Sequence, residues 1–221
     1  MTRTVIFDLD GTLADTSADL IAAANYCFER LDLGQPLDPV ADARTAFRGA
    51  RAMLTLGLER RGQFSADLVE AWYPELLVQY GREIDVHTRL YDGAMEAVEA
   101  LKSDGFRVGI CTNKPEGLAD TLLRRLGVLD AFHSMIGADT LPVRKPNPTP
   151  YFEAVQRAGG DAARSILIGD TETDRETARA ASVPCVLVTF GPDGHGVSAL
   201  KSEAYLNHFN ELPDLAARLL A

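Results

Sequence analysis

Short apolar runs alternate with helical patterns along most of this 221-residue chain. Five short runs predict strands: the first is rich in β-branched and aromatic residues, and the second is typical of a buried parallel strand. These strands are expected over residues 4–9, 106–113, 132–139, 165–170 and 184–190. Helices are expected between and after them, over residues 93–105, 116–127, 149–159, 173–183 and 211–220. The alternation predicts an α/β fold, a doubly wound parallel sheet with helices on both faces.

One block of the chain interrupts this alternation. From Ser17 to about Tyr80, apolar side chains recur at helical spacing and no strand pattern occurs. We therefore predict a four-helix insert over residues 16–86. The α/β core would then comprise residues 1–15 and 87–221.

Polar side chains stand at the ends of the predicted strands, where open α/β sheets bind ligands. Those that follow strands are Asp8, Asp10, Thr112, Asn113, Asp139 and Asp170, with Asp174 shortly beyond and Lys145 in a loop before a proline. Asp8 and Asp10 are two residues apart on an extended chain, so their side chains point the same way and repel.

Four carboxylates are expected to converge at this edge of the sheet: Asp8, Asp10, Asp170 and Asp174. Such a group is stable only with a hard divalent cation, and Mg²⁺ fits oxygen ligands best. The lysine in the loop, Lys145, adds a second positive charge.

This arrangement favours phosphoryl chemistry. A carboxylate beside Mg²⁺ can attack phosphorus, and a second carboxyl group can exchange protons with the leaving group and with water. The phosphoryl oxygens need positive groups and hydrogen-bond donors around them. The candidates for this phosphate-binding role are Gly11, Thr12, Thr112, Asn113 and Lys145.

Four motifs in order resemble the haloacid dehalogenase superfamily of phosphatases, within it the phosphoglycolate phosphatase-like branch. D-L-D-G-T at 8–12 matches its first motif, and T-N-K-P at 112–115 resembles its second. Lys145-Pro146 resembles the third, and G-D-T-E-T-D at 169–174 matches the fourth. The resemblance extends over nearly the whole chain.

The resemblance implies roles for these residues. Asp8 would be the nucleophile and Asp10 the acid/base, with Thr112 in the phosphate-binding position. Mg²⁺ would be held by Asp8, by the backbone carbonyl of Asp10 and by Asp170. Asp174 would act through water or by orienting the motif lysine, and the helical insert would be a cap.

Substrate selectivity is expected to come from the cap. Arg48 and Arg51 flank Gly49, and Arg44 is near. An arginine can bind a carboxylate through two parallel hydrogen bonds, which would suit phosphoglycolate. The alternative is that these arginines are solvated charges on exposed helices.

Composition removes several classes of function. A formal net charge of −10 argues against nucleic-acid or anionic-membrane partners. No apolar segment approaches the ~20 residues of a membrane span, and the N-terminus shows no signal-peptide pattern. The three cysteines form no metal motif and suit a reducing cytoplasm. A monomer or a homodimer is expected.

The leading hypothesis is a Mg²⁺-dependent phosphomonoester hydrolase for a small metabolite, with phosphoglycolate as the candidate substrate. A sugar phosphomutase of the same fold is the first alternative. A haloacid dehalogenase needs neither Mg²⁺ nor the second aspartate of the first motif, so Asp10 and Asp170 count against it. A catalytically idle binding module on this fold is the last alternative.

Overall fold

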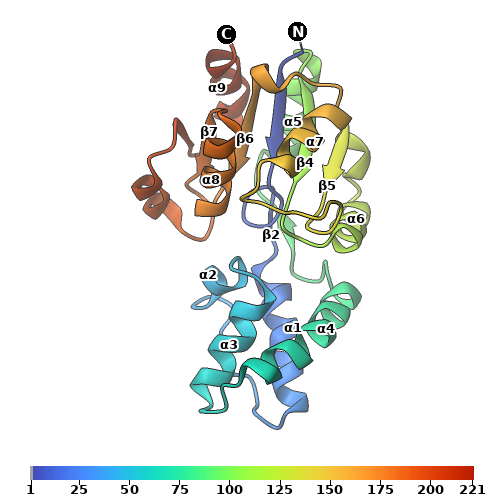
Figure 1. Cartoon of the computed structure of the whole chain (residues 1–221), viewed down its shortest axis with the longest axis vertical. Helices are drawn as coiled ribbons and strands as arrows, with labels where there is room; N and C mark the ends of the chain where they lie inside the picture. The colour runs from blue at the N-terminus through green and yellow to red at the C-terminus, as the bar shows by residue number, and fades with distance from the viewer. Residues whose placement is uncertain (1) are drawn as a thin grey trace. The chain divides into compact units, whose positions relative to one another are not determined.

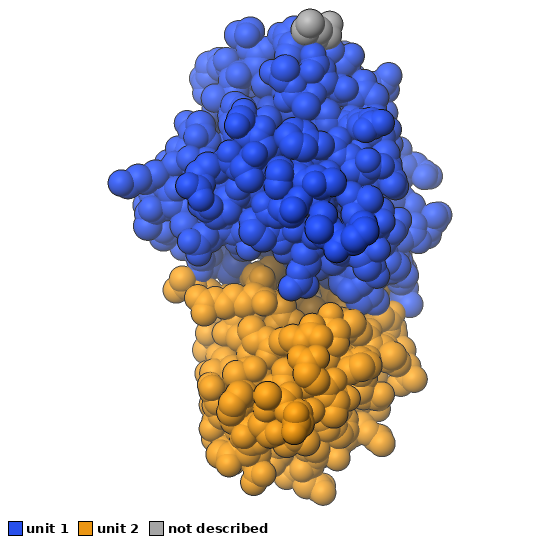
Figure 2. All heavy atoms as spheres, viewed as in Figure 1, with its two compact units in different colours: residues 1–14, 90–221 blue, residues 15–89 orange. Residues whose placement is uncertain are grey.

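The computed structural model describes residues 2–221, which form two compact units, coloured separately in Figure 2. The core unit comprises the residues up to Ala14 together with Leu90–Ala221, and the cap unit is Asp15–Arg89. Two short strands, β2 (Ala14–Asp15) and β3 (Arg89–Leu90), pair with each other where the chain passes between the units.

The core unit contains a six-stranded parallel sheet in the order β5-β4-β1-β6-β7-β8 (Figure 1). Its strands are β1 (Thr4–Phe7), β4 (Arg107–Cys111), β5 (Ser134–Ile136), β6 (Ser165–Gly169), β7 (Cys185–Val188) and β8 (Ala204–Leu206). The predicted doubly wound parallel sheet is thereby confirmed. The sixth strand was not predicted, because three residues between polar segments carry too little pattern.

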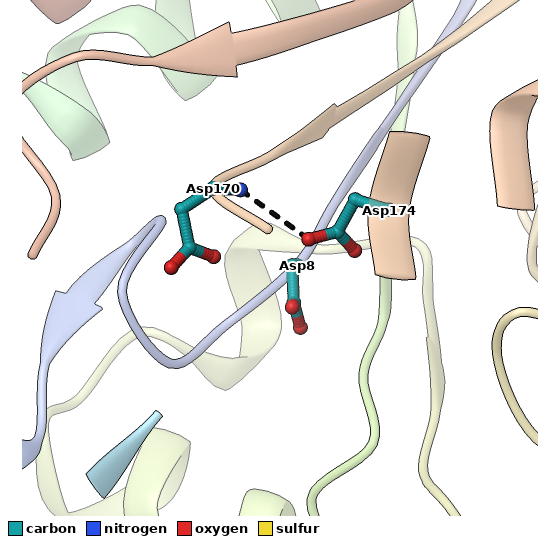
Figure 3. A group of neighbouring side chains, drawn as sticks. All are labelled: Asp8, Asp170 and Asp174. Carbon is teal, nitrogen blue, oxygen red and sulfur yellow. Dashed lines mark hydrogen bonds between the residues drawn. The ribbon is translucent and has the colours of Figure 1, made fainter. Parts of the chain in front are cut away.

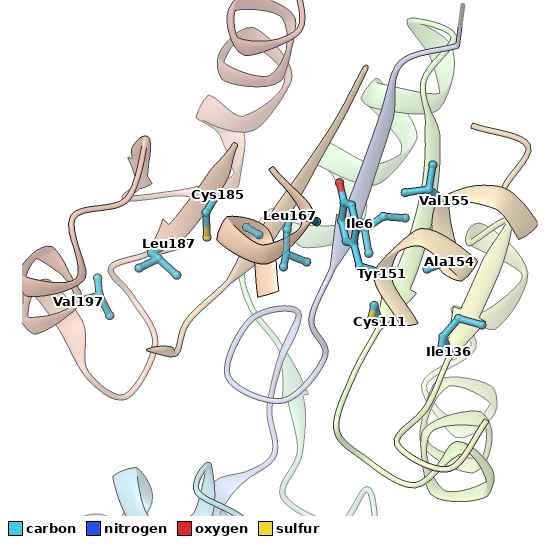
Figure 4. Packing of buried hydrophobic residues seen from close by; sticks show 12 residues of the cluster. Ile6, Cys111, Ile136, Tyr151, Ala154, Val155, Leu167, Cys185, Leu187 and Val197 are labelled. Carbon is cyan, nitrogen blue, oxygen red and sulfur yellow. The ribbon is translucent and has the colours of Figure 1, made fainter. Parts of the chain in front are cut away.

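Helices cover both faces of this sheet. On one face, α7 (Thr149–Arg157) and α8 (Glu172–Ala181) pack on alternate strand residues such as Ile6, Leu167 and Leu187, which join one buried cluster (Figure 4). On the other face, α5 (Ala94–Ser103) packs with α9 (Leu212–Leu219). The last core helix is α6 (Glu116–Arg125), which follows β4.

The cap unit is helical. It contains α1 (Ser17–Arg30), α2 (Ala43–Ala46), α3 (Ala50–Arg60) and α4 (Ala66–Arg82). α1 and α3 both pack on α4. Gly57 in α3 allows the ring of Phe28 in α1 to pack directly against the helix, since a Cβ at Gly57 would lie 2.2 Å from that ring. The cap unit therefore has an apolar core of its own.

Two further expectations concern the chain as a whole. Within residues 2–221, none of the helices combines the length and the apolar character needed to cross a bilayer. Cys27, Cys111 and Cys185 are free and buried.

Candidate active site

Three carboxyl groups converge at the carboxyl edge of the sheet (Figure 3). Asp8 directly follows β1, Asp170 directly follows β6, and Asp174 lies in the first turn of α8. β1 and β6 are neighbours in register, so Asp8 and Asp170 leave the sheet side by side. The ligand atoms of the three residues all lie within 4.8 Å of one another.

Lys145 supplies the positive charge at the centre of this cluster. Its ammonium lies 3.0 Å from Asp8 Oδ2 and 2.6 Å from Asp174 Oδ1. The lysine is buried, and its backbone carbonyl accepts a hydrogen bond from Asn113 Nδ2 at 3.0 Å. One lysine thus bridges the end of β1 and the start of α8.

Asp174 is fixed by its own loop as well as by Lys145. Its Oδ2 accepts hydrogen bonds from the backbone N–H and the hydroxyl of Thr171, at 3.1 and 2.7 Å. Gly169 lies directly beneath it, since a Cβ at that position would be 2.3 Å from the Asp174 carboxyl carbon. Glycine is therefore required here because a carboxylate occupies the space of a side chain.

Asp170 has one satisfied and one unsatisfied oxygen. Oδ1 accepts a hydrogen bond from Thr12 Oγ1 at 3.0 Å. Oδ2 is buried and has no hydrogen-bond partner among residues 2–221. A buried carboxylate oxygen without a donor is costly, and a cation would satisfy it. The donor set of the three acids therefore fits a hard cation.

The electrostatics agree with this interpretation. Burial raises the pKa of Asp8 to about 6, although Lys145 opposes the shift. Burial also raises the pKa of Asp170 well above its usual range, with further contributions from Asp174 and Asp8. Burial disfavours the ammonium of Lys145, but the carboxylates of Asp174 and Asp8 outweigh it and raise the pKa. Without a bound cation, Asp8 and Asp170 therefore hold protons more tightly than exposed aspartates do.

The second predicted motif follows β4. Thr112 is buried, and its hydroxyl oxygen accepts the backbone N–H of Lys114 at 3.2 Å. That bond uses a lone pair, so the hydroxyl hydrogen can be donated elsewhere. Asn113 holds the Lys145 carbonyl, and its own Oδ1 is buried without a partner among the described residues.

Asp10 pairs with a residue that the sequence hypothesis did not select. Lys114 Nζ lies 2.8 Å from Asp10 Oδ1, and the lysine side chain is only 3% exposed. A lysine in a loop is most often a solvated charge, so the sequence alone gave little reason to choose it. The one available signal was its position two residues after Thr112, inside the second motif.

Other predicted residues have local partners. The N–H groups of Gly11 and Thr12 donate to the carbonyls of Ala14 and Leu9, which closes the turn after β1. Asp139 accepts the backbone N–H of Glu116 at 2.7 Å and so caps the start of α6.

Within the cap unit, Arg48 and Arg51 differ in their surroundings. Arg51 binds Glu70 through two hydrogen bonds of 2.6 and 2.8 Å and stacks on the ring of Tyr73. Arg48 is exposed, and its guanidinium has no partner among residues 2–221. Gly49 between them has a φ of 95°, a conformation that favours glycine.

Comparison with known proteins identifies the family. Residues 5–188 match the model of the haloacid dehalogenase-like hydrolases. The chain is 36% identical over 219 residues to a phosphoglycolate phosphatase of Rhodospirillum rubrum, covering 97% of this chain and 90% of the relative. It is 35% identical to that of Mesorhizobium japonicum, covering 98% and 96%.

Solved structures show the same fold. A predicted phosphoglycolate phosphatase from Haemophilus somnus superposes with a TM-score of 0.84 at 24% identity, covering 97% of both chains. A HAD-superfamily hydrolase from Geobacter sulfurreducens superposes with a TM-score of 0.75 at 23% identity, covering 97% of this chain and 96% of its own.

The chain therefore belongs to the haloacid dehalogenase-like hydrolases. Within them it is a phosphatase, similar over nearly its whole length to phosphoglycolate phosphatases. The family resemblance and the enzyme class expected from the four motifs are both confirmed.

Proposed function

We propose that this phosphatase hydrolyses phosphomonoesters with Mg²⁺, through a phosphorylated Asp8. The observation that supports this most directly is the meeting of Asp8, Asp170 and Lys145 in one buried cluster, with an unpartnered carboxylate oxygen. Asp8, Asp170 and the carbonyl of Asp10 would hold the metal, and Asp174 would orient Lys145. The bound ion would neutralise the carboxylates and the phosphoryl oxygens.

The chemistry follows from the residues themselves. A carboxylate oxygen of Asp8 forms a bond to phosphorus while the bond from phosphorus to the ester oxygen breaks. The departing oxygen takes its electron pair and a proton from Asp10. Water then attacks the phosphorus, gives its proton to Asp10 and releases phosphate from Asp8. Thr112 donates its hydroxyl hydrogen to the phosphoryl group, and Lys145 balances its charge.

The direct test replaces Asp8 with asparagine and measures phosphate release from phenyl phosphate. We expect a loss of more than about 1,000-fold, because asparagine cannot act as the nucleophile. Asp139→Asn is the matched control: it also changes an aspartate after a strand, but one that caps α6. Retained activity in Asp8→Asn would reject the nucleophile, and turnover after chelation of divalent ions would reject the metal.

For the substrate we propose a small phosphorylated carboxylic acid, with phosphoglycolate as the first candidate. The names of the relatives support this choice. So does the exposed Arg48, whose guanidinium is not engaged as that of Arg51 is by Glu70. We further propose a cytoplasmic location, which suits three free cysteines.

Replacing Arg48 with alanine tests its role in specificity. A lost carboxylate contact should raise KM for phosphoglycolate by about 10-fold or more and leave phenyl phosphate, which has no carboxylate, nearly unchanged. Arg51→Ala is the control, because its guanidinium is already bound within the cap unit. Equal effects on both substrates would contradict the assignment, as would isomerisation of hexose phosphates in place of hydrolysis.

A further inference from the structure

Lys114 is a buried lysine beside the proposed acid/base. It lies between β4 and α6, with its ammonium 2.8 Å from Asp10 Oδ1. Both partners belong to the core unit. Only four of the 22 basic residues of this chain are lysines, and two of those four, Lys114 and Lys145, are buried at this site.

The backbone of Lys114 is anchored on both sides. Its N–H donates to Thr112 Oγ1 at 3.2 Å, and its carbonyl accepts the N–H of Ala138 at 2.9 Å. These bonds tie it to the ends of β4 and β5. The backbone of Lys114 is therefore held in place. A residue that positions another side chain needs such an anchored backbone.

Burial of the Lys114 ammonium is unfavourable by itself, because the charge loses its hydration. An ammonium taken out of water is unfavourable unless it is paired, and a buried pair is often no more stable than an apolar pair of similar volume. Stability alone therefore does not explain the pair. Asp10 is 20% exposed by its side chain, whereas Lys114 is buried behind it, so the lysine holds the acid from the protein side.

We propose that Lys114 is a positioning residue for Asp10: the ammonium fixes the carboxyl group where it meets the departing ester oxygen. The inference rests on the proposed phosphatase mechanism. In the step concerned, the bond from phosphorus to oxygen breaks, the oxygen keeps the electron pair, and the proton moves from Asp10 to that oxygen. Misplacing Asp10 slows the proton transfer and leaves the attack of Asp8 intact.

Two substrates separate positioning from a general structural role. An alkyl phosphate such as phosphoglycolate has a basic leaving oxygen that needs the proton. Dinitrophenyl phosphate has a weakly basic leaving oxygen that departs without it. The value of kcat/KM reports the step in which the leaving group departs, so it is unaffected by the later hydrolysis of phosphorylated Asp8.

The experiment measures kcat/KM for both substrates in Lys114→Met. We expect a loss of about 10- to 100-fold with phosphoglycolate and of less than about 3-fold with dinitrophenyl phosphate. Asp10→Asn should show the same selectivity more strongly. The double variant should lose no more than Asp10→Asn alone, because the lysine acts through the aspartate.

Lys102→Met is the matched control. It removes a lysine that pairs with Glu99 on α5, and both kcat/KM values should stay unchanged. The ratio of the two values within one preparation does not depend on the folded fraction, so partial unfolding of Lys114→Met does not obscure the result. Lys114→Arg, which keeps the charge, should recover part of the phosphoglycolate activity.

Equal losses on both substrates would overturn the proposal, and so would full activity on both. A wild-type protein that releases no phosphate from either substrate would instead reject the proposed function. The two failures are therefore distinguishable.

Discussion

At the scale of single residues, a buried carboxyl group of the site lowers the free energy of unfolding once it loses its proton. Burial raises the pKa of Asp8 to about 6, so the folded protein holds a proton on Asp8 more tightly than the unfolded chain does. Between the ordinary pKa of 3.8 and about 6, the folded state therefore loses stability as pH rises. Asp42 in the cap unit shows the opposite shift, because its hydrogen bonds to Arg60 lower its pKa.

This difference predicts opposite pH effects in two asparagine variants. Asp8→Asn should match the metal-free wild type at about pH 4 and exceed its free energy of unfolding by a few kcal/mol at about pH 7. Asp42→Asn should instead be less stable than wild type near neutral pH, and this deficit should shrink as the pH falls through the acidic range, where wild-type Asp42 also loses its charge. Urea unfolding at several pH values measures both differences, and adding Mg²⁺ should reduce the advantage of Asp8→Asn. A constant difference from acid to neutral pH would contradict the shift at Asp8.

Single residues also show where sequence reasoning was sufficient. Four carboxylates and Lys145 were predicted to meet, and the structure places Asp8, Asp170 and Asp174 in one cluster with the lysine. Their strand-end positions are set by the register of parallel strands, which alternation and order along the chain reveal. The prediction was wrong for Asp10, which lies outside this cluster and pairs with Lys114 instead. Lys114 was missed because its partner, Asp10, is 104 positions away, and no local pattern encodes that pairing.

At the scale of elements, the strands with strong apolar patterns were predicted and the short ones were not. β6 carries five buried residues, so its sequence alone predicts a strand. β8 has three residues, and β2 and β3 have two each. Such short strands exist because a neighbouring strand offers hydrogen bonds, and this tertiary cause leaves little trace in the sequence.

The junction of β6 and α8 gives a prediction about glycine. In Gly169→Ala, the new Cβ would lie 2.3 Å from the Asp174 carboxyl carbon and 2.6 Å from its Oδ2. Asp174 must move and release Lys145, so activity should fall at least about 10-fold and stability by about 1–3 kcal/mol. Phosphate release and thermal unfolding measure the two effects.

Gly117 in α6 is the matched control for this substitution. A Cβ there meets nothing within 4 Å, and the residue is exposed. Because alanine favours the helix over glycine, Gly117→Ala should be neutral or stabilise by up to about 1 kcal/mol. A similar loss in both variants would show that the contact with Asp174 is not what requires Gly169.

At the scale of the whole molecule, the chain enters and leaves the cap unit through the two paired strands β2 and β3. Within the cap unit, Asp19 links the first helix to the last residues before the chain leaves. Its buried carboxylate accepts the N–H of His87 at 2.9 Å and both the N–H and the hydroxyl of Thr88 at 2.8 Å. The first turn of α1 is thereby joined to the last residues of the cap unit. One side chain holds together segments that lie 68 and 69 positions apart.

Asp19→Ala tests whether the two units unfold independently. Leaving the donors of His87 and Thr88 without an acceptor should destabilise the cap unit by about 2–4 kcal/mol. Amide hydrogen exchange in α1 and α4 should then accelerate by about 100-fold, while β1 and β6 keep their protection. Asp67→Ala, an exposed acid in the first turn of α4, should change neither. Equal acceleration of exchange in β1 and β6 would mean that the two units unfold together. The paired strands β2 and β3 would then couple the stability of the core unit to that of the cap unit.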